Sequence, residues 1–314
     1  MSDATALGPG REFDLIRELV RRWGAAARGI GDDAAVLDVP PGARLVASTD
    51  ATVENVHFRQ GWLTPAEIGY RAATAALSDL AAMAAAPLAM LVALAVPPAW
   101  RAVLGEIGDG LGDAARSFGA PITGGNLTGA SELAITVTVL GSSTRVLRRD
   151  AAQSGDSLYV TGTLGGPRAA LEAWARGVSP SSEHRARFAR PAARIREAGW
   201  LAAHGARAAI DVSDGLFSDA LHLATASGVS LTIELDAVPV VSGVPARDAL
   251  ASGEEYELLV SGARLDEHAF AREFGLPLTR VGSVDAPGAG PPAVRVRANG
   301  GFVDLSPGHD HFSG

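Results

Sequence analysis

The chain has 314 residues, of which 47% are hydrophobic and 20% charged, which is enough for one large or two medium globular domains. It contains no cysteine, so disulfides, thiolate metal sites and cysteine nucleophiles are excluded. All 27 basic residues are arginine, which excludes Walker A loops, the strand lysine of protein kinases and Schiff-base catalysis. The net charge of −8 argues against a nucleic-acid partner, which would favour a basic surface.

The beginning of the chain predicts neither export nor membrane insertion. It lacks the basic region followed by an apolar run that export signals have, so we expect a cytoplasmic protein. The most apolar stretch, residues 72–96, is mostly alanine and carries Asp79 and Pro87. This composition predicts a buried helix followed by a strand, with no membrane span.

Helices and strands are predicted to alternate in the first half of the chain. Apolar residues recur at helical spacing over residues 13–23, which predicts an amphipathic helix. Thr64 and Glu67 flank a proline in a capping box, which should open a helix that continues to about Ala84. The other expected elements are strands over residues 44–48, 88–96 and 132–140, a helix over residues 100–118, and a sharp turn at Gly124 and Gly125.

A polar, arginine-rich segment over residues 142–157 predicts a domain boundary, after which the pattern of elements restarts. We therefore expect two domains, residues 1–144 and residues 145–314. The expected elements of the second domain are strands over residues 157–161, 208–212, 231–235 and 256–260, helices over residues 167–176, 192–204 and 216–226, and a glycine-rich turn over residues 162–166. This alternation predicts an α/β or α+β fold in both halves, with sheets covered by helices.

Acidic residues recur where strands end or where turns follow them. They are Asp32, Asp33, Asp50, Asp79, Asp211 and Asp214. Each lies among small or apolar residues, where an ionised carboxylate is costly unless it is paired or bound to a metal. Carboxylate oxygens favour Mg²⁺ or Mn²⁺, and Mg²⁺ commonly bridges carboxylates and phosphates, so we expect these acids to meet around cations that bind a polyphosphate. Taken singly, each cluster is more often a helix cap or a turn.

A series of motifs runs along almost the whole chain: GIGDDAAVL, STD followed by VHF, LSDLAAM, GGN, VTGTLG, DVSDGL, SGEEYELL and a terminal HF. Their order resembles the thiamine-monophosphate kinase family, in the superfamily of aminoimidazole ribonucleotide (AIR) synthetase. The resemblance implies phosphorylation of thiamine monophosphate to thiamine diphosphate by Mg²⁺-assisted direct transfer from ATP. It also implies an AIR synthetase-like fold and a homodimer whose N-terminal sheets pair. Residues 1–144 would be the ATP- and Mg²⁺-binding dimerisation domain, and residues 145–314 the AIR synthetase-like C-terminal domain.

The resemblance also implies roles for individual residues. The magnesium ligands correspond to Asp33, Ser48, Thr49, Asp50, Asp79, Asp211 and Asp214, with Asp32 as the neighbouring acid. The nucleotide contacts correspond to Gly125, Asn126, Arg149 and Ser213, and the thiamine phosphate contacts to His57, Glu254 and His309. Several Mg²⁺ ions and an arginine can neutralise phosphoryl oxygens without a lysine. By spacing alone, His57, Glu254 and Arg149 are equally open to structural or solvated roles.

Four positions depart from the family pattern, and one of them is Ala76, which stands where the family often has asparagine, so that an amide is lost. Asn126 stands where the family has an aspartate, which removes charge from one magnesium site, and Glu255 stands where aspartate is common. His309 stands where an aromatic ring is expected to stack on thiamine. Two alternatives therefore stay open: another ATP-dependent enzyme of the superfamily, or a catalytically weakened nucleotide-binding homologue. The absence of cysteine argues against selenophosphate synthetases and the hydrogenase-maturation members.

Overall fold

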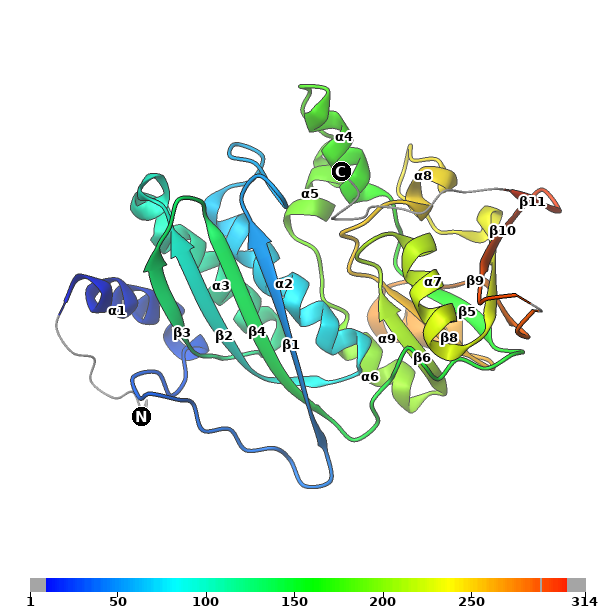
Figure 1. Ribbon diagram of the computed structural model, residues 1–314, viewed down its shortest axis with the longest axis horizontal. Coiled ribbons are helices and arrows are strands. Elements are labelled where there is room, and N and C mark those ends of the chain that lie inside the picture. Colours follow the sequence, from blue (N-terminus) through cyan, green and yellow to red (C-terminus); the bar gives the residue numbers. More distant parts are fainter. Residues whose placement is uncertain (1–9, 289, 304–314) are drawn as a thin grey trace. The chain divides into compact units, whose positions relative to one another are not determined.

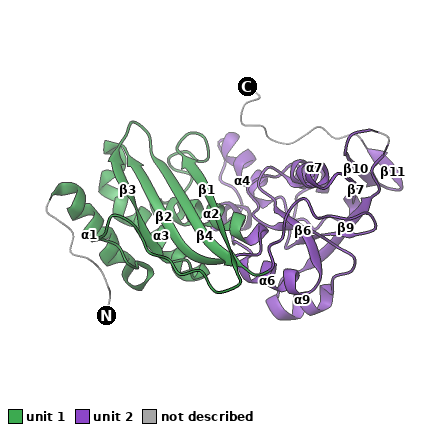
Figure 2. Ribbon diagram, turned by 60° about the horizontal axis from the view of Figure 1, so that its bottom comes forward, with its two compact units in different colours: residues 1–80, 86–144 green, residues 81–85, 145–314 purple. Residues whose placement is uncertain are grey.

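A computed structural model describes residues 10–288 and 290–303 of the chain, which divides into two compact units (Figures 1 and 2). Unit 1 contains Met1–Leu80 and Ala86–Thr144, and unit 2 contains Ala81–Ala85 and Arg145–Gly314. The chain passes from unit 1 to unit 2 after Thr144, within the polar segment where the sequence predicts a boundary. Ala81 and Ala82 join unit 2 because they pack in one of its hydrophobic clusters. The functions implied for the two domains stay predictions.

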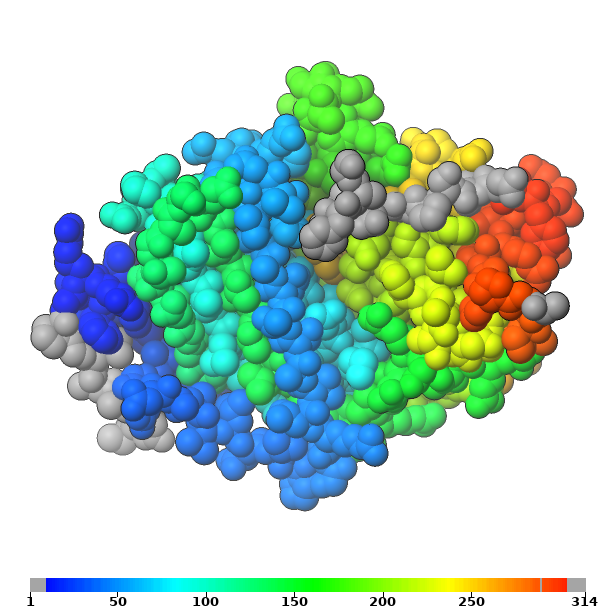
Figure 3. Space-filling model, viewed as in Figure 1, coloured from blue at the N-terminus to red at the C-terminus, as the bar shows by residue number. Residues whose placement is uncertain are grey.

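Unit 1 is a four-stranded sheet with the order β1-β4-β2-β3. The strands are β1 (Arg44–Val53), β2 (Ala86–Val96), β3 (Ile122–Gly129) and β4 (Ala134–Ser143). Strands β2 and β3 are parallel, and the other neighbouring pairs are antiparallel. Helices α2 (Pro65–Ala82) and α3 (Leu104–Phe118) cover one face, and α1 (Arg11–Trp23) packs against α3 (Figure 1). Figure 3 looks onto the opposite face, where the strands reach the surface.

The capping box predicted at the start of α2 is confirmed. The Thr64 backbone N–H donates to Glu67 Oε2 at 2.8 Å, and the Glu67 N–H donates to Thr64 Oγ1 at 3.3 Å. These bonds satisfy N–H groups that have no partner within the helix. The helix ends at Ala82, close to the predicted end at about Ala84. The predicted helix over residues 100–118 begins instead as a 3₁₀ helix, Pro98–Val103, before α3.

Alternation along β4 gives the sheet of unit 1 two different faces. Ile135, Val137 and Val139 are fully buried, whereas Thr136 and Thr138 between them are half-buried. Burial of each large apolar side chain contributes roughly 1.5–3 kcal/mol to folding. A one-residue slip of β4 would bury the threonines and expose the apolar side chains, so the register of this strand is strongly fixed.

The prediction of a sharp turn at Gly124 and Gly125 is wrong. Both glycines and Asn126 lie in β3, an edge strand paired in parallel with β2. Gly125 has a φ of +154°, and a Cβ there would lie 1.9 Å from the Val92 carbonyl oxygen, so only glycine fits. Glycine is depleted in strands, which is why the sequence did not predict this one.

Unit 2 contains a seven-stranded sheet with the order β11-β10-β7-β9-β5-β8-β6. The strands are β5 (Ser157–Thr161), β6 (Ala206–Asp211), β7 (Ser230–Glu234), β8 (Leu258–Gly262), β9 (Leu278–Asp285), β10 (Val294–Ala298) and β11 (Gly301–Val303). The helices are α4 (Gly166–Ala175), α5 (Ser182–Ala189), α6 (Ile195–Ala203), α7 (Leu216–Ser227), α8 (Ala246–Leu250) and α9 (Glu267–Phe274).

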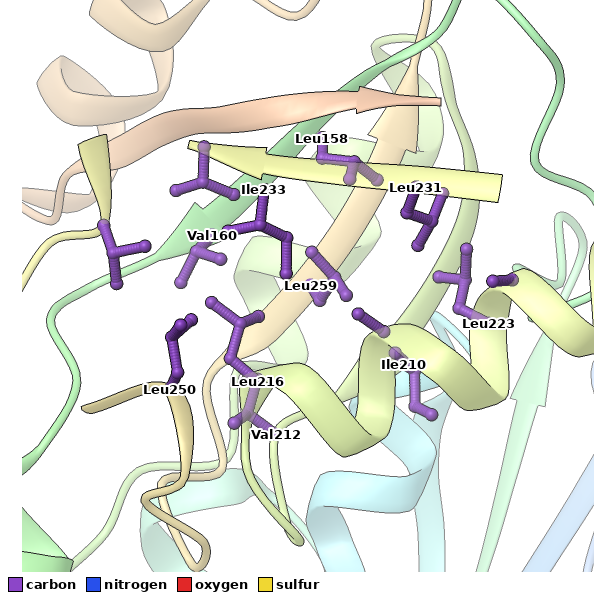
Figure 4. Close-up of a cluster of buried hydrophobic side chains, with 14 of the residues drawn as sticks. Leu158, Val160, Ile210, Val212, Leu216, Leu223, Leu231, Ile233, Leu250 and Leu259 are labelled. Carbon is purple, nitrogen blue, oxygen red and sulfur yellow. The ribbon is translucent and has the colours of Figure 1, made fainter. Parts of the chain in front are cut away.

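Helix α7 closes one hydrophobic core of unit 2 (Figure 4). Leu216 and Leu223 of this helix are fully buried and belong to the same cluster as Leu158, Leu231 and Leu259 of the sheet. The first residue of α7 is therefore anchored to the core. The loop that precedes it, which carries the DVSDG motif, begins from a rigid support.

The strands and helices predicted between residues 157 and 235 are confirmed, with ends shifted by a few residues. The strand predicted over residues 256–260 begins only at Leu258, because Glu254 and Tyr256 have left-handed φ values of 64° and 55°. The sequence did not predict α5, α8, α9 or β9 to β11, which are mostly short. Among the described residues, no helix combines the length and apolar character needed to cross a bilayer.

Candidate functional site

Three motifs of unit 2 emerge at the same edge of its sheet. Strands β5 and β6 both pair antiparallel with β8, so β5 and β6 run in the same direction. Their carboxyl ends, Thr161 and Asp211, lie level with Leu258, where β8 begins. The VTGTLG, DVSDGL and SGEEYELL segments therefore meet at this edge. Open α/β sheets bind ligands at the carboxyl ends of parallel strands.

Backbone hydrogen bonds tie two of these segments together, namely the DVSDG loop (residues 211–215) and the EEYE segment (residues 254–257). The Glu254 N–H donates to the Ser213 carbonyl oxygen at 2.7 Å. The Val212 carbonyl oxygen accepts from the N–H groups of Glu255 at 3.1 Å and Tyr256 at 2.9 Å. The left-handed φ of Glu254 thus belongs to a turn that is fixed on both sides, since strain of this kind persists only where its surroundings determine it. Ser213 and Glu254, two predicted contact residues, are neighbours.

Asp219, a residue that the motif assignment missed, organises the DVSDG loop. Its Oδ2 accepts the backbone N–H groups of Ser213, Asp214 and Gly215, each at 3.1 Å, and the residue is only 1% exposed. Burial, together with the charges of Asp211 and Asp214, raises the pKa of Asp219 to about 8. A divalent cation bound by those two neighbours would oppose this rise. The signal in the sequence was an acid in the first turn of the following helix.

Glu257 forms a second buried carboxylate centre at the same edge. Arg194 donates from Nε to Oε2 at 2.7 Å and from Nη2 to Oε1 at 2.5 Å. The Thr161 hydroxyl donates to Oε2 at 2.7 Å and accepts the Leu258 N–H at 2.9 Å. A Cβ at Gly162 would lie 2.2 Å from Glu257 Oε1, so the glycine allows the carboxylate to approach. Contacts of Thr161 and Gly162 with Glu257 thereby connect the VTGTLG segment to the EEYE segment.

Glu255 is another buried acid of this edge. Its Oε1 accepts the Gly165 backbone N–H and the Ser252 hydroxyl, both at 2.5 Å. Burial raises the pKa of Glu255 to about 8, against the opposing effect of these two hydrogen bonds. The residue that departs from the family pattern therefore links the glycine-rich segment of α4 to the EEYE segment.

In unit 1, Ser48 and Asp79 are in direct contact. The Ser48 hydroxyl of β1 donates to Asp79 Oδ2 of α2 at 2.5 Å. Asp50 lies two residues further along β1 and therefore faces the same side of the sheet as Ser48. Two expectations are corrected: Asp79 lies within a helix and not at a strand end, and Asp50 lies within β1, which continues to Val53.

Thr49 faces the other side of the sheet, where its hydroxyl lies 3.0 Å from the hydroxyl of Thr138. A cavity of about 950 Å³ on this side is lined by Thr138, Gly125, Asn126, Asp32 and Asp33, among others. Asp32 and Asp33 are exposed, which corrects the expectation that each acidic cluster lies in apolar surroundings. The predicted magnesium ligands of unit 1 are thus divided between the two faces of its sheet.

Two of the residues predicted to contact the substrates, His57 and Arg149, differ in burial and in their hydrogen bonds. His57 is half-buried, and its Nδ1 accepts the Val53 N–H at 3.0 Å, so a neutral ring carries its proton on Nε2. The side chain of Arg149 is exposed, and its carbonyl oxygen accepts the Ser227 hydroxyl at 2.7 Å. His309 and the terminal HF motif lie outside the described residues.

The chain matches known families and proteins along most of its length. Residues 31–143 match the AIR synthase related protein, N-terminal domain, and residues 153–291 match the C-terminal domain of the same family. The thiamine-monophosphate kinase of Salmonella typhimurium is 35% identical over 325 residues, which cover 96% of this chain and 98% of the relative. The chain belongs to the thiamine-monophosphate kinase family. The thiamine-monophosphate kinase of Rhodopirellula baltica is 34% identical over 86% of this chain.

Solved structures of thiamine-monophosphate kinases have the same fold. The enzyme of Stenotrophomonas maltophilia is 34% identical, with a TM-score of 0.79 over 90% of this chain and 96% of the other. The complex of AaThiL with AMPPCP and TMP is 29% identical, with a TM-score of 0.74 over 94% and 96% of the two chains. Hydrogenase maturation protein HypE in complex with ATP shares the fold alone, at 21% identity and a TM-score of 0.79 over 96% of both chains. The predicted AIR synthetase-like α/β fold and kinase class are confirmed.

The magnesium assignment of this thiamine-monophosphate kinase family member stays a prediction. Within the described ranges, no three histidine, aspartate or glutamate side chains lie close enough together to hold a metal ion. The donor chemistry nevertheless fits Mg²⁺, because the predicted ligands offer hard oxygen atoms in both units. Asp211 is buried, 4% exposed, and Asp214 is half-buried, so a cation bound there would offset the cost of their charge.

Proposed function

We propose that this chain transfers the γ-phosphoryl group of ATP directly to thiamine monophosphate, which gives thiamine diphosphate and ADP. The observation that carries the proposal is the match to a thiamine-monophosphate kinase over 96% of this chain and 98% of the relative. A structural relative has been crystallised with AMPPCP, a non-hydrolysable ATP analogue, and TMP. Both substrates of the proposed reaction therefore have counterparts in that relative.

In the proposed reaction the chain's own residues position the two phosphates. Asp211 and Asp214 of the DVSDG loop, and Asp33, Ser48, Thr49, Asp50 and Asp79 of unit 1, are proposed to hold Mg²⁺, with Asp32 beside them. When bound, Mg²⁺ neutralises charge on the triphosphate oxygens, a task that a chain without lysine cannot give to an ammonium group.

Nucleotide and acceptor contacts are proposed for the remaining assigned residues. Ser213, Gly125, Asn126 and Arg149 are proposed to contact ATP, and His57, Glu254 and His309 to contact thiamine monophosphate. His57 can donate from Nε2 because its Nδ1 already accepts a backbone N–H. Glu254 is tied to Ser213 by a 2.7 Å backbone hydrogen bond, so the two contact types share one preorganised turn.

Incubation of the purified chain with ATP, Mg²⁺ and thiamine monophosphate tests the proposal. Chromatography should show thiamine diphosphate and ADP in equal amounts, and EDTA should stop their formation. A folded preparation that binds ATP but does not form thiamine diphosphate would refute the proposal. Release of ADP and inorganic phosphate with formylglycinamidine ribonucleotide would instead favour another enzyme of the superfamily.

Asn126 favours one alternative, a catalytically weakened nucleotide-binding homologue. It lines the same cavity as Asp32 and Asp33 but brings no charge to it. Under this alternative, the chain binds Mg²⁺-ATP tightly, shows no acceptor-dependent ADP release, and gains that release with Asn126→Asp. Turnover by the unmodified chain would exclude it.

We also propose that the protein is a homodimer in which the sheets of unit 1 pair. Support comes from β1, where Leu45 is 53% exposed and Ala47 and Ala51 are exposed on the same side. Surfaces of this kind are common in interfaces between copies of a chain. Sedimentation should give a dimer for the unmodified chain and a monomer for Leu45→Arg. A monomer at micromolar concentration of unmodified chain would contradict the proposal. A cytoplasmic location stays a prediction.

A further inference from the structure

We propose that Asp219 is a positioning residue for the cation-binding loop: its carboxylate fixes the backbone of residues 213–215 so that Asp211 and Asp214 are aimed at their cation. This inference rests on the proposed function, because it concerns the loop assigned to Mg²⁺ and ATP. Asp219 itself touches neither cation nor nucleotide in this proposal.

The backbone of residues 213–215 has the geometry of an anion-binding site, and the Asp219 carboxylate occupies the position of the anion. Three successive backbone N–H groups, of Ser213, Asp214 and Gly215, converge on Oδ2 of Asp219 at 3.1 Å each. Such a concavity ahead of a helix is where proteins commonly bind phosphate. Because a carboxylate already occupies it, these N–H groups are not available to the triphosphate. The loop is left to act through the side chains of Asp211 and Asp214.

The anchor of this arrangement is the hydrophobic core. Asp219 lies in the first turn of α7, between Leu216 and Leu223, which are both fully buried. Gly215 has a φ of +113°, and a Cβ there would lie 3.0 Å from the Leu250 carbonyl oxygen. Glycine adopts this conformation without strain, whereas a residue with a Cβ would not fit, so the loop has a defined conformation that is held from two sides. The Asp219 carboxylate, whose helix is packed in the core, stabilises this conformation through its hydrogen bonds to the loop backbone.

A competing explanation is that Asp219 attracts the cation only through its negative charge. Two substitutions of Asp219 distinguish the effect of the position of its carboxylate from the effect of its charge. Asp219→Asn keeps the shape and one acceptor oxygen but loses the charge, whereas Asp219→Glu keeps the charge but moves the carboxylate by one methylene group. Positioning predicts that affinity for the cation falls from Asp to Asn to Glu. A charge effect predicts that Glu stays close to Asp and that Asn is weakest.

The experiment measures Mn²⁺ binding to the full chain by electron paramagnetic resonance, with AMPPCP present at a fixed concentration. We expect Asp219→Glu to raise the dissociation constant of Mn²⁺ at least tenfold, and Asp219→Asn to raise it by a smaller factor. An affinity of Asp219→Glu within twofold of the unmodified chain would overturn the inference. Should Asp219→Glu fail to fold, Asp219→Ala replaces it: positioning predicts much weaker binding than with Asn, and equal binding would overturn the inference.

Asp156 provides a matched control within unit 2. It is also 1% exposed, its Oδ2 accepts the Gln153 N–H at 3.1 Å, and Arg207 donates to its Oδ1. It precedes Ser157, which pairs with Gly262 at the far end of β8, whereas Asp211 pairs with Leu258 at the near end. Asp156→Glu should lower the melting temperature about as much as Asp219→Glu but change Mn²⁺ affinity less than twofold. Equal losses of affinity in both variants would overturn the inference.

The same measurements distinguish this inference from the proposed function. If the unmodified chain binds Mn²⁺ and AMPPCP but forms no thiamine diphosphate, the proposed function fails and the order of variant affinities still decides the role of Asp219. If the unmodified chain binds no Mn²⁺ in the presence of AMPPCP, the inference is overturned as well.

Discussion

The DVSDG loop of unit 2 and the Asp32–Asp33 segment of unit 1 carry the same kind of acidic signal, yet the structure holds them differently. In the DVSDG loop, Asp219 binds three backbone N–H groups and the EEYE segment pairs with Val212. Asp32 and Asp33 are exposed, and the Asp33 N–H donates to its own neighbour, Asp32, at 2.9 Å. Buried groups on neighbouring elements therefore fix the DVSDG loop, whereas the hydrogen bond between Asp32 and Asp33 stays within the exposed segment itself.

Removal of the Glu257 side chain should lower the free energy of unfolding more than any other substitution considered. This buried carboxylate binds Arg194 and Thr161 at the edge of the sheet that carries the DVSDG loop. Glu257→Ala removes the carboxylate that lies 2.5 Å from Arg194, whose side chain is 13% exposed, and leaves Arg194 with the more distant carboxylate of Glu197 at 3.5 Å. Breaking a buried ion pair in this way costs about 3–5 kcal/mol in the free energy of unfolding. Urea denaturation measures the loss. Glu234→Ala, which breaks the half-exposed pair with Arg297, is the control and should move the midpoint little.

The same substitution, aspartate to asparagine, should affect the two regions differently. Asp211→Asn should lower kcat/KM about 100-fold or more, because in its proposed role a buried ligand of Mg²⁺ would contribute several kcal/mol of charge stabilisation. Asp32→Asn should lower kcat/KM less than about tenfold, since the exposed side chain has water and neighbours to replace it. Steady-state kinetics at saturating Mg²⁺ provide the measurement. Equal losses in the two variants would show that the exposed acids are as strictly positioned as the buried one.

A smaller effect is expected at the Ser48–Asp79 contact of unit 1. Ser48→Ala removes a 2.5 Å hydrogen bond to a carboxylate. A bond to a charged group contributes about 1.5–3 kcal/mol, so the Mg²⁺ concentration for half-maximal activity should rise roughly tenfold or more. The exposed Ser131→Ala serves as the control in unit 1. An unchanged Mg²⁺ requirement for Ser48→Ala would separate this contact from the cation site.

A prediction of a different kind concerns the pH dependence of stability. The folded pKa of Glu255 is about 8, above its ordinary value of 4.5, so the folded state holds a proton that the unfolded state releases. This contribution to stability is complete below about pH 4.5 and is lost as the pH rises towards about 8. Glu255→Gln should therefore flatten the decline of the melting temperature between about pH 5 and pH 8. An unchanged slope would mean that another group dominates in this range.

Local patterns in the sequence predicted much of the fold. The capping box of Thr64 and Glu67, the helical spacing over residues 13–23 and the strands between residues 157 and 235 depend on neighbours in the chain, and all were confirmed. Strand β3 was missed because its glycine-rich sequence resembles a turn, and only pairing with β2 makes it a strand. Short helices such as α5 lack the length over which helical periodicity becomes visible.

The candidate site could be predicted as a set of residues but not as an arrangement. The motifs point to Asp211, Asp214 and Glu254, but the pairing register of β5, β6 and β8 decides that their segments share one edge. The division of Ser48 and Thr49 between two faces follows from strand alternation within a β1 that is longer than expected. Asp219 and Glu257 were missed because each acts on backbone or arginine partners that the sequence alone does not bring near.

Fold similarity alone would not have distinguished the activities of relatives. HypE and the Stenotrophomonas maltophilia kinase have the same TM-score of 0.79 against this chain, but their identities are 21% and 34%. The scaffold is thus shared by proteins with different names. The lower identity to HypE agrees with the absence of cysteine, which argued against the hydrogenase-maturation members.

Isotope labelling distinguishes direct phosphoryl transfer from hydrolysis of ATP. The full chain is incubated with Mg²⁺, thiamine monophosphate and ATP labelled in the γ-phosphate. Direct transfer predicts that the label appears in the terminal phosphate of thiamine diphosphate, with one labelled phosphate for each ADP formed. Label found only in inorganic phosphate, with unlabelled thiamine monophosphate recovered, would contradict it.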